Sequence, residues 1–371
     1  MSRKKIFFLI PSLASGGSER VFSILANHLD TEKWDITVVI LNGSQRFYTI
    51  DENRVRLIDL QVARVRQAFS KIIGLVRSEK PDLVVSTLTH LNQFIGLVKP
   101  FLPSKIRFIA RESTILSVFH QRETMPYLRD WLIRHLYPSF DALICQSERM
   151  ANDFKNNYHI APSKLKIINN PVDTEGVLKA ALSAKVTPKN ARFRFVSVGR
   201  LSAEKGLDKA LRILASLETR DFDYQIIGEG SERGHLENLT KTLGLSENVQ
   251  FQGVQKNPFS WIQSADFLFL TSDFEGFPNV LLEAGAVGTP VIAFSCGGVV
   301  DEIIINGING FVVPDGDETA FKAAILRGCS TRFDSAYIQN LTKEKFGVTK
   351  IVAAYDILFL ETMLNHVKRK N

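Results

Sequence analysis

Short, nearly continuous apolar runs recur along the chain, separated by longer stretches in which apolar residues return every three or four positions. Short apolar runs are typical of strands buried on both faces, and the longer period is typical of helices. In the first half, strands are predicted at Lys5–Ile10, Asp35–Leu41, Asp82–Thr87, Arg107–Ala110 and Asp141–Gln146. This alternation predicts a parallel sheet covered by helices on both faces.

A second series of the same kind follows a polar, Ala- and Lys-rich stretch from Asp173 to Asn190. Its strands are predicted at Phe193–Val198, Tyr224–Ile227, Val249–Phe251, Phe267–Leu270, Pro290–Phe294 and Phe311–Val313. At 371 residues the chain exceeds what one hydrophobic core usually serves, so two α/β domains are expected. We assign residues 1–175 to the first domain and 190–347 to the second, and predict a final amphipathic helix from Val348 to Val367.

The stretch from Thr271 to Pro290 directly follows the buried run that ends at Leu270. It begins with a Gly- and Pro-containing turn and continues as a predicted helix, and ligands of parallel sheets bind outside the carboxyl ends of the strands. A helix start at that edge favours an anion. Glu275 lies in the turn and Glu283 about two helical turns later. Two acids in a phosphate pocket suit hydroxyl groups, such as those of a sugar or a ribose beside a diphosphate.

The other predicted carboxyl ends are also rich in glycine or polar residues: Pro11–Gly17, Gly199–Gly206, Gly228–Gly230 and Gly253-Val254. Ser18 is expected to cap the helix after the first of these loops. In the second loop, Arg200 and Lys205 flank a turn that starts a helix. Two cations there would neutralise a diphosphate and stabilise it as a leaving group. The alternative is an ordinary pair of solvated cations at a helix start.

The net charge of +7 resides in residues 1–175, which carry 24 Lys and Arg against 17 Asp and Glu; the remainder has 22 of each. Such a basic half favours an anionic partner. No nucleic-acid-binding module is recognisable, so nucleic acid is not an expected partner. Basic residues interleaved with Val65, Phe69, Ile72 and Ile73 fit an anionic bilayer or, equally, a core-packed helix with a solvated face. These basic residues are Arg54, Arg56, Arg64, Arg66, Lys71 and Arg77.

The three cysteines, Cys145, Cys296 and Cys329, are widely spaced and odd in number, which suits a reducing compartment. No apolar run approaches the length of a membrane span. We therefore expect a cytoplasmic protein, with peripheral attachment to the inner face of a membrane as an option. Asp221-Phe222-Asp223 and Asp315-Gly316-Asp317 match an Asp-x-Asp metal motif, but both are expected to be exposed turns, so no metal is predicted.

Taken together, these motifs resemble those of the retaining nucleotide-sugar glycosyltransferases of group 1, family 4. The residues that carry the resemblance are Gly16-Gly17, Val198-Gly199-Arg200 to Lys205-Gly206, Gly228-Glu229-Gly230, Glu275-x7-Glu283, Gly288-Thr289-Pro290-Val291 and Gly297-Gly298. The resemblance covers nearly the whole chain. It implies the GT-B fold, in which two doubly wound Rossmann-like domains face a central cleft and a C-terminal helix crosses back to the first domain.

The resemblance also implies roles for single residues. Arg200 and Lys205 would hold the diphosphate, Glu283 would accept hydrogen bonds from the ribose, and Glu275 would bind hydroxyls of the donor sugar. Val254 would lie near the base, and Gly16 and Gly17 would let the backbone of the first domain approach the donor. The full set of implied donor-binding residues besides Glu283 is Gly16, Gly17, Gly228, Val254, Gly276, Phe277, Pro278, Asn279 and Val280.

The activity implied is transfer of a hexose or N-acetylhexosamine from a UDP-sugar to a glycan or lipid-linked acceptor, with retention and without a metal. A nucleotide-sugar epimerase, a phosphorylase and a non-catalytic UDP-sugar-binding protein are the alternatives. The chain departs from many relatives after the strand Arg107–Ala110, where it has Arg111-Glu112-Ser113 in place of a frequent histidine. Arg111 and Glu112 are thus candidates for the acceptor side, or for a buried ion pair.

Overall fold

The computed structural model describes residues 3–44, 46–120, 125–183, 186 and 188–368. The chain forms two compact units. The first unit comprises Met1–Pro171 together with Val348–Asn371, and the second comprises Val172–Gly347. The end of the chain thus returns to the first unit, as the resemblance to the GT-B fold predicted.

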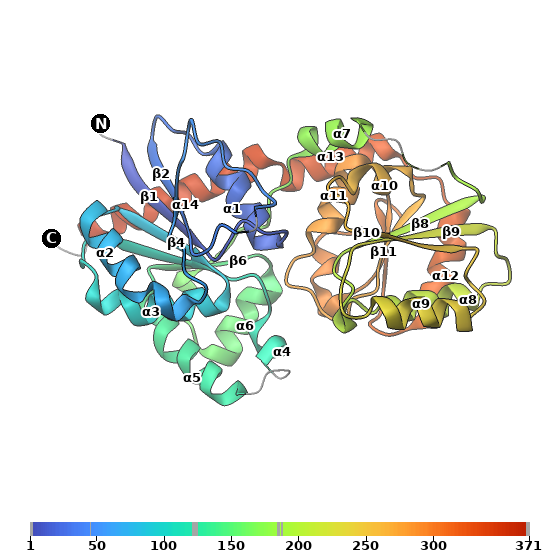
Figure 1. Cartoon of the computed structure of the whole chain (residues 1–371), viewed down its shortest axis with the longest axis horizontal. Helices are drawn as coiled ribbons and strands as arrows, with labels where there is room; N and C mark the ends of the chain where they lie inside the picture. The colour runs from blue at the N-terminus through green and yellow to red at the C-terminus, as the bar shows by residue number, and fades with distance from the viewer. Residues whose placement is uncertain (1–2, 45, 121–124, 184–185, 187, 369–371) are drawn as a thin grey trace. The chain divides into compact units, whose positions relative to one another are not determined.

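The first unit is built on a parallel sheet of seven strands in the order β3-β2-β1-β4-β5-β6-β7 (Figure 1). Its strands are β1 (Lys4–Ile10), β2 (Trp34–Ile40), β3 (Arg56–Asp59), β4 (Leu83–Thr87), β5 (Arg107–Arg111), β6 (Ala142–Cys145) and β7 (Leu165–Ile167). Phe7 and Phe8, neighbours on β1, are both fully buried, and they belong to different core clusters. Since successive side chains of a strand point to opposite faces, both faces of this sheet are covered.

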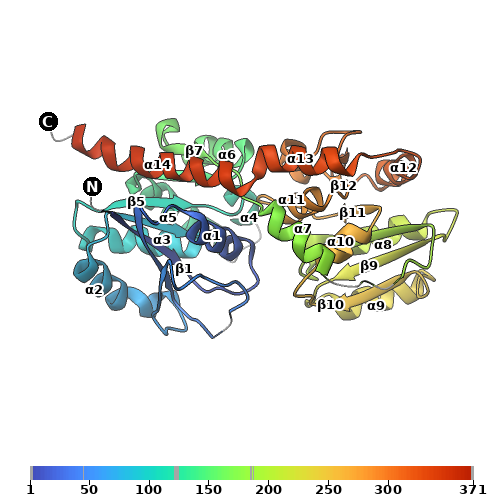
Figure 2. The ribbon, with the colours of Figure 1, turned by 90° about the horizontal axis from the view of Figure 1, so that it is seen from above.

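Two groups of helices provide that cover. The helices α1 (Gly17–His28) and α14 (Val348–Lys368) pack on the Phe8 face through residues such as Leu25 and Phe359. Figure 2 shows α14 lying beside α1. The opposite face is covered by α2 (Phe69–Glu79), α3 (Thr89–Val98), α5 (Pro126–Leu136) and α6 (Glu148–Tyr158), with the short α4 (Leu116–His120) before α5. Short 3-10 helices are η1 (Val65–Ala68), η2 (Lys99–Phe101), η3 (Tyr137–Ser139) and η4 (Pro162–Lys164).

The second unit has a parallel sheet of six strands in the order β10-β9-β8-β11-β12-β13. Its strands are β8 (Phe193–Val198), β9 (Phe222–Ile227), β10 (Val249–Gly253), β11 (Phe267–Leu270), β12 (Val291–Phe294) and β13 (Gly310–Val313). Phe195 and Val196 divide between the two core clusters of this unit, so this sheet is also covered on both faces.

The helices of the second unit are α7 (Thr174–Ser183), α8 (Leu207–Ala215), α9 (Arg233–Thr242), α10 (Phe259–Ser264), α11 (Asn279–Val287), α12 (Glu318–Cys329) and α13 (Ser335–Phe346). Its 3-10 helices are η5 (Ala203–Lys205), η6 (Cys296–Gly298) and η7 (Val300–Glu302). The stretch predicted as a connection contains α7, which packs on α10 and α11 within the second unit.

Two details of the first unit differ from the sequence prediction. The strands β3 and β7 were not predicted, because both are short edge strands with partly exposed residues. Ser18 does not cap α1: the N-cap residue is Gly16, which makes no side-chain cap. Ser18 is buried within the first turn, where its hydroxyl oxygen accepts a hydrogen bond of 3.4 Å from Nη1 of Arg111. Among the described residues, no helix is both long and apolar enough to cross a membrane.

Candidate functional site

The carboxyl ends of β8 and β11 frame a pocket in the second unit. Both strands are buried apolar runs followed by polar loops. Because the strands are parallel, these loops lie at the same edge of the sheet. The pocket is lined by Ser197, Val198, Gly199, Arg200, Leu201, Lys205, Leu207, Ile226, Ile227, Phe269, Leu270, Thr271 and Ser272. Both cations predicted from the sequence are therefore at this edge.

Glycine residues let the loop after β8 and the loop after β9 touch through their backbones. A Cβ added to Gly228, whose φ is +144°, would lie 1.8 Å from the carbonyl oxygen of Gly199. One added to Gly230 would lie 2.1 Å from the carbonyl oxygen of Leu201. The amide of Leu201 donates to the carbonyl of Glu229 at 2.9 Å, so the two loops form one backbone layer. Any side chain at Gly228 would push this layer apart.

Lys205 and Glu275 meet at the pocket. Nζ of Lys205 lies 2.7 Å from Oε1 of Glu275, and the hydroxyl of Ser272 donates to the same carboxylate oxygen at 2.7 Å. The Lys205 side chain is 28% exposed and that of Glu275 13% exposed. Both charges are thus partly desolvated, which strengthens their field at the mouth of the pocket. Nothing in the sequence singled out Ser272 except its place directly after a buried strand.

The loop that carries Lys205 is fixed to the strand end of β11. The hydroxyl of Thr271 donates to the carbonyl of Lys205 at 3.1 Å. Gly206 has a φ of +57°, and a Cβ there would lie 2.3 Å from the carbonyl oxygen of Thr271. Arg200, in contrast, is exposed, and it forms no ion pair with any residue that the structure describes. Its guanidinium is therefore available for an anion.

The helix α11 begins at this edge with Asn279. Val280 is half-buried, and Glu283, one turn into the helix, is 7% exposed. Phe277 and Pro278 are buried, and Phe277 packs edge-on against Phe346 with ring centroids 5.9 Å apart. Of the predicted turn, Phe277 and the buried Gly276 can therefore offer a ligand only their backbone.

Val254 follows the end of β10 and is 62% exposed. In the first unit, Gly17 begins α1 after the loop that contains Gly16. Gly17 is exposed and Gly16 is half-buried. A Cβ on Gly16 would lie 2.0 Å from a carboxylate oxygen of Glu19, so a side chain there would require Glu19 to move.

Arg111 is completely buried at the carboxyl end of β5. Its Nη1 donates to the hydroxyl of Thr87 at 3.2 Å, and its Nη2 donates to Oδ1 of Asn170 at 2.5 Å. With the contact to Ser18, the guanidinium joins the start of α1, the end of β4 and the last residues of the first unit before Pro171. The side chain does not reach the surface, so its contacts are with the protein.

Glu112 is also buried, with 1% exposure, and forms a separate hydrogen-bond network. Asn92 donates to Oε1 at 2.7 Å, Thr89 donates to Oε2 at 2.9 Å, and the Tyr137 hydroxyl also donates to Oε1. Burial raises the pKa of Glu112 and outweighs these hydrogen bonds, which lower it. Neither Arg111 nor Glu112 is therefore exposed to an acceptor, and no ion pair joins them among the described contacts.

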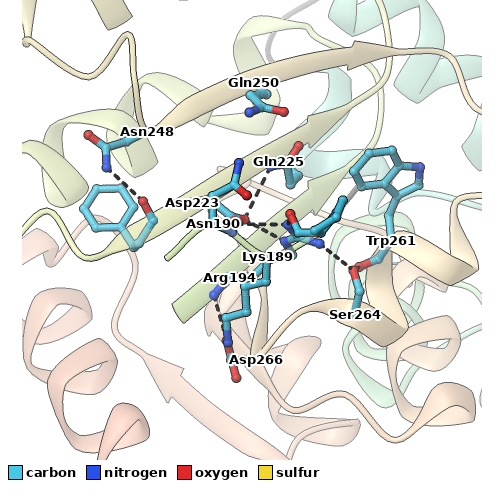
Figure 3. Close-up of polar contacts among 12 residues, drawn as sticks. Lys189, Asn190, Arg194, Asp223, Gln225, Asn248, Gln250, Trp261, Ser264 and Asp266 are labelled. Atoms are coloured by element: carbon cyan, nitrogen blue, oxygen red, sulfur yellow. Dashed lines mark hydrogen bonds and ion pairs between the residues drawn. The ribbon is translucent and has the colours of Figure 1, made fainter. Parts of the chain in front are cut away.

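The two Asp-x-Asp motifs have structural roles. Asp223 is not an exposed turn residue, as predicted, but is buried in a bidentate ion pair with Arg194, with Nε–Oδ1 and Nη2–Oδ2 distances of 2.7 and 3.0 Å (Figure 3). Asp315 accepts hydrogen bonds from the amides of Cys296 and Gly297 at 2.6 and 2.8 Å. The remaining two aspartates accept bonds from backbone amides. The described residues contain no cluster of three His, Cys, Asp or Glu side chains that could hold a metal ion.

Two sequence families match the two halves of the chain. Residues 179–344 match the family described as "Glycosyl transferases group 1", and residues 15–176 match "Glycosyltransferase Family 4". The division between the matches falls close to the boundary between the two units at Val172. The Gly-rich and acidic motifs of the second unit thus lie within the match to the first of these families.

Two individual relatives are also named as glycosyltransferases. The chain is 30% identical, over 78% of its length and 80% of the relative, to the Campylobacter jejuni N-acetylgalactosamine-N,N'-diacetylbacillosaminyl-diphospho-undecaprenol 4-alpha-N-acetylgalactosaminyltransferase. It is 24% identical, over 86% of its length and 89% of the relative, to the amylovoran biosynthesis glycosyltransferase AmsD of Erwinia amylovora.

Solved structures share the architecture. The Anabaena protein HepE in complex with UDP-glucose matches 95% of this chain and 99% of its own, with a TM-score of 0.76 and 19% identity. A glycosyltransferase from Rickettsia africae matches 98% and 99%, with a TM-score of 0.80 and 17% identity. The chain therefore belongs to the group 1, family 4 glycosyltransferases and has their GT-B fold.

Proposed function

We propose that the chain transfers a hexose or N-acetylhexosamine from a UDP-sugar to a glycan or lipid-linked acceptor, with retention of configuration. The observation that carries the proposal is the contact of Lys205 with Glu275 at the carboxyl edge of the second sheet. A cation for a diphosphate and a carboxylate for sugar hydroxyls stand side by side, as a nucleotide diphosphate sugar requires.

Lys205 and Arg200 stabilise the departing diphosphate. Charge develops on the leaving phosphate oxygens as the bond to the anomeric carbon breaks, and fixed cations in a partly desolvated pocket stabilise that charge. The start of α11 adds the positive end of a helix dipole. We propose that these groups take the place of a metal ion.

Glu275 and Glu283 recognise hydroxyl groups. Ser272 and Lys205 both hold Glu275 through Oε1, so we assign the other oxygen, Oε2, to hydroxyls of the donor sugar. Glu283 is the nucleotide-side acid, for the ribose. A carboxylate accepts two hydroxyl hydrogens, which makes an acid the suitable residue type in both places.

Retention follows from attack on the same face that the diphosphate leaves. The bond between the anomeric carbon and the phosphate oxygen breaks, and the acceptor oxygen forms its bond on that face. The acceptor proton passes to the departing phosphate oxygen, so no protein nucleophile is needed. Glu275 forms an ion pair in the pocket and is assigned to sugar hydroxyls, not to nucleophilic attack.

The relatives support the choice of donor and acceptor. HepE has been solved with UDP-glucose, and the Campylobacter relative is named for an acceptor on undecaprenol diphosphate. A second Campylobacter relative, 26% identical over 85% of this chain and 86% of its own, is also named for a polyprenol-diphosphate acceptor. AmsD is named for amylovoran biosynthesis. We propose a role in polysaccharide or glycolipid assembly at the cytoplasmic face of a membrane, and the three free cysteines suit that reducing compartment.

A donor panel with a polyprenol-diphosphate glycan acceptor tests the proposal. We expect one UDP-sugar to give acceptor-dependent UDP release and an α-linked product by NMR, with and without EDTA. A β-linked product would contradict retention, and loss of transfer in EDTA with recovery on adding Mg²⁺ would contradict metal independence. Conversion of the donor without acceptor would identify an epimerase, and a requirement for inorganic phosphate would identify a phosphorylase.

A further inference from the structure

The outward face of α5 is unusually apolar and aromatic. Tyr127 is 89% exposed, Trp131 54% and Leu128 47%. Their spacing of three and four positions places them on one side of the helix, whereas Ile133 on the other side is fully buried in the core of the first unit. Met125, directly before the helix, is 57% exposed. We name Met125, Tyr127, Leu128 and Trp131 the α5 face.

The exposed side chains of the α5 face form one contiguous group and are not scattered over the surface. Single exposed apolar side chains are ordinary, but a contiguous group on one helix marks an interaction surface. Tyr and Trp are enriched where one end of the side chain meets an apolar phase and the other meets water. Trp131 stacks on His135, with ring centroids 4.4 Å apart and planes at 29°, so the indole is held in place while it remains exposed.

The charges near the α5 face are suited to an anionic surface. Arg134 is exposed on the same helix, one turn on from Trp131, and its guanidinium also lies over the Tyr158 ring, 5.8 Å from the centroid. Asp130 is the only acid in α5; it is half-buried and accepts a hydrogen bond of 3.0 Å from the Tyr158 hydroxyl. The outward side of the helix thus presents aromatic and basic groups without an exposed carboxylate.

The division into units makes the charge asymmetry larger than the sequence halves suggest. With its C-terminal segment included, the first unit carries 28 Lys and Arg against 17 Asp and Glu, a net charge of +11. The second unit carries 18 against 22, a net charge of −4. An anionic surface would therefore attract the first unit and repel the second.

The basic segment around α2, for which the sequence left a bilayer contact and a core-packed helix equally open, has other contacts. Ile72 is buried against the sheet with 1% exposure, so the apolar side of α2 is part of the core. Several cations of this segment bind protein groups: Arg56 pairs with Glu79 at 3.0 Å, Lys71 donates to the Leu60 carbonyl at 2.6 Å, and Arg77 donates to the Phe101 carbonyl at 2.9 Å. On α2 only Phe69, 41% exposed, remains at the surface, beside Phe101 at 53%. The α5 face is the larger and more exposed of the two apolar groups.

The α5 face begins near the carboxyl edge of the first sheet. The chain leaves the carboxyl end of β5 at Arg111, and α5 returns it through η3 to the amino end of β6. The first turn of α5, with Tyr127 and Leu128, consequently lies toward the carboxyl edge of the first sheet. Gly16 and Gly17 lie at the same edge, after β1. A bilayer on the α5 face would keep a lipid-linked acceptor beside that edge.

We propose that the α5 face docks the first unit onto an anionic lipid bilayer, with the aromatic side chains at the headgroup level and Arg134 against lipid phosphates. Docking would give the protein access to a lipid-linked acceptor. Only this purpose of the contact rests on the proposed function. The contact itself needs neither donor nor transfer.

Co-sedimentation with vesicles tests the docking directly. We expect the whole protein to bind vesicles of phosphatidylcholine mixed with phosphatidylglycerol more tightly than phosphatidylcholine alone. Tyr127→Ser/Trp131→Ser should weaken that binding about tenfold or more, and Arg134→Glu should reduce the preference for the anionic mixture. Trp131 fluorescence should shift to the blue on binding.

Tyr337→Ser is the matched control, because Tyr337 is also 54% exposed but lies on α13 of the second unit. It should bind vesicles as the wild type does, and all variants should keep wild-type UDP binding. Absence of wild-type binding, or equal binding by the Tyr127→Ser/Trp131→Ser variant, overturns the proposal. So does a dimer, or binding of soluble glycan, that depends on the same residues. UDP release with a soluble acceptor reports on the proposed function separately.

Discussion

Nζ of Lys205 lies 2.7 Å from Oε1 of Glu275, although the two residues are 70 positions apart in the chain. One comes from the loop after β8 and the other from the loop after β11, which are adjacent strands of the second sheet. The pair joins the group assigned to the diphosphate with the group assigned to the donor sugar. It is the structural basis of the proposed transfer.

Lys205→Ala should slow transfer strongly. The variant removes a fixed cation from the leaving diphosphate, which costs about a hundredfold or more in kcat/KM. Initial rates of UDP release measure this. Lys209→Ala is the matched control, since Lys209 lies on the following helix turn and pairs with Asp273. Similar losses in the two variants would show that general charge, and not the position of Lys205, matters.

Glu283→Gln should weaken binding of UDP itself. Loss of a charged acceptor for a ribose hydroxyl lowers affinity by about tenfold, which isothermal calorimetry with UDP can measure. Glu237→Gln removes an acid that pairs with Arg233 on the exposed side of α9, and it should leave UDP affinity unchanged. Wild-type affinity for UDP in Glu283→Gln would remove this residue from the nucleotide site.

Gly228→Ala should destabilise the second unit. Its Cβ would meet the Gly199 carbonyl at 1.8 Å with φ at +144°, so the loop must move at a cost of about 2 kcal/mol or more. Urea unfolding measures the change. Gly234→Ala, where the added Cβ meets nothing within 4 Å in α9, should instead stabilise by about 0.5–1 kcal/mol. Equal free energies of unfolding for the two variants would contradict the packing described for the loops.

Because of Glu112, the free energy of unfolding should fall with rising pH. Burial raises its folded pKa above the ordinary 4.5, so its favourable contribution is complete below that value and is lost as pH rises through the raised folded value. Glu112→Gln removes this titration. We therefore expect a smaller decrease of Tm from the ordinary carboxyl range to neutral pH than in the wild type. A variant with the wild-type slope would show that Glu112 does not titrate across this window.

The strands of the second unit could be predicted from the sequence because they are buried on both faces. β8 and β11 have the predicted bounds, whereas β3, with one exposed and three half-buried residues, has no apolar run to detect. The edge strands β10 and β13 contain alternating or continuous apolar residues and were predicted, so a strand is detectable by its apolar pattern and not by its place in the sheet. For the same reason the Gly-rich and polar loops that follow these patterns were predictable as a group.

Contacts across strands could not be predicted in this way. The roles of Arg111 and Glu112 were left open between acceptor contact and an ion pair, and the structure instead buries each in its own network. The partners Asn170 and Tyr137 come from distant parts of the chain and carry no motif. The burial of Asp223 beside Arg194 was missed for the same reason, because both lie near the amino ends of adjacent strands.

Calorimetric binding of UDP and of the active UDP-sugar to Glu275→Gln tests the assignment of Glu275 to the donor sugar and of Lys205 to the diphosphate. Replacing the carboxylate removes a sugar contact and also frees Lys205 from its ion pair. We expect the variant to bind UDP at least as tightly as the wild type, while its affinity for the UDP-sugar falls about tenfold. An equal loss for both ligands, or no change for either, would contradict it.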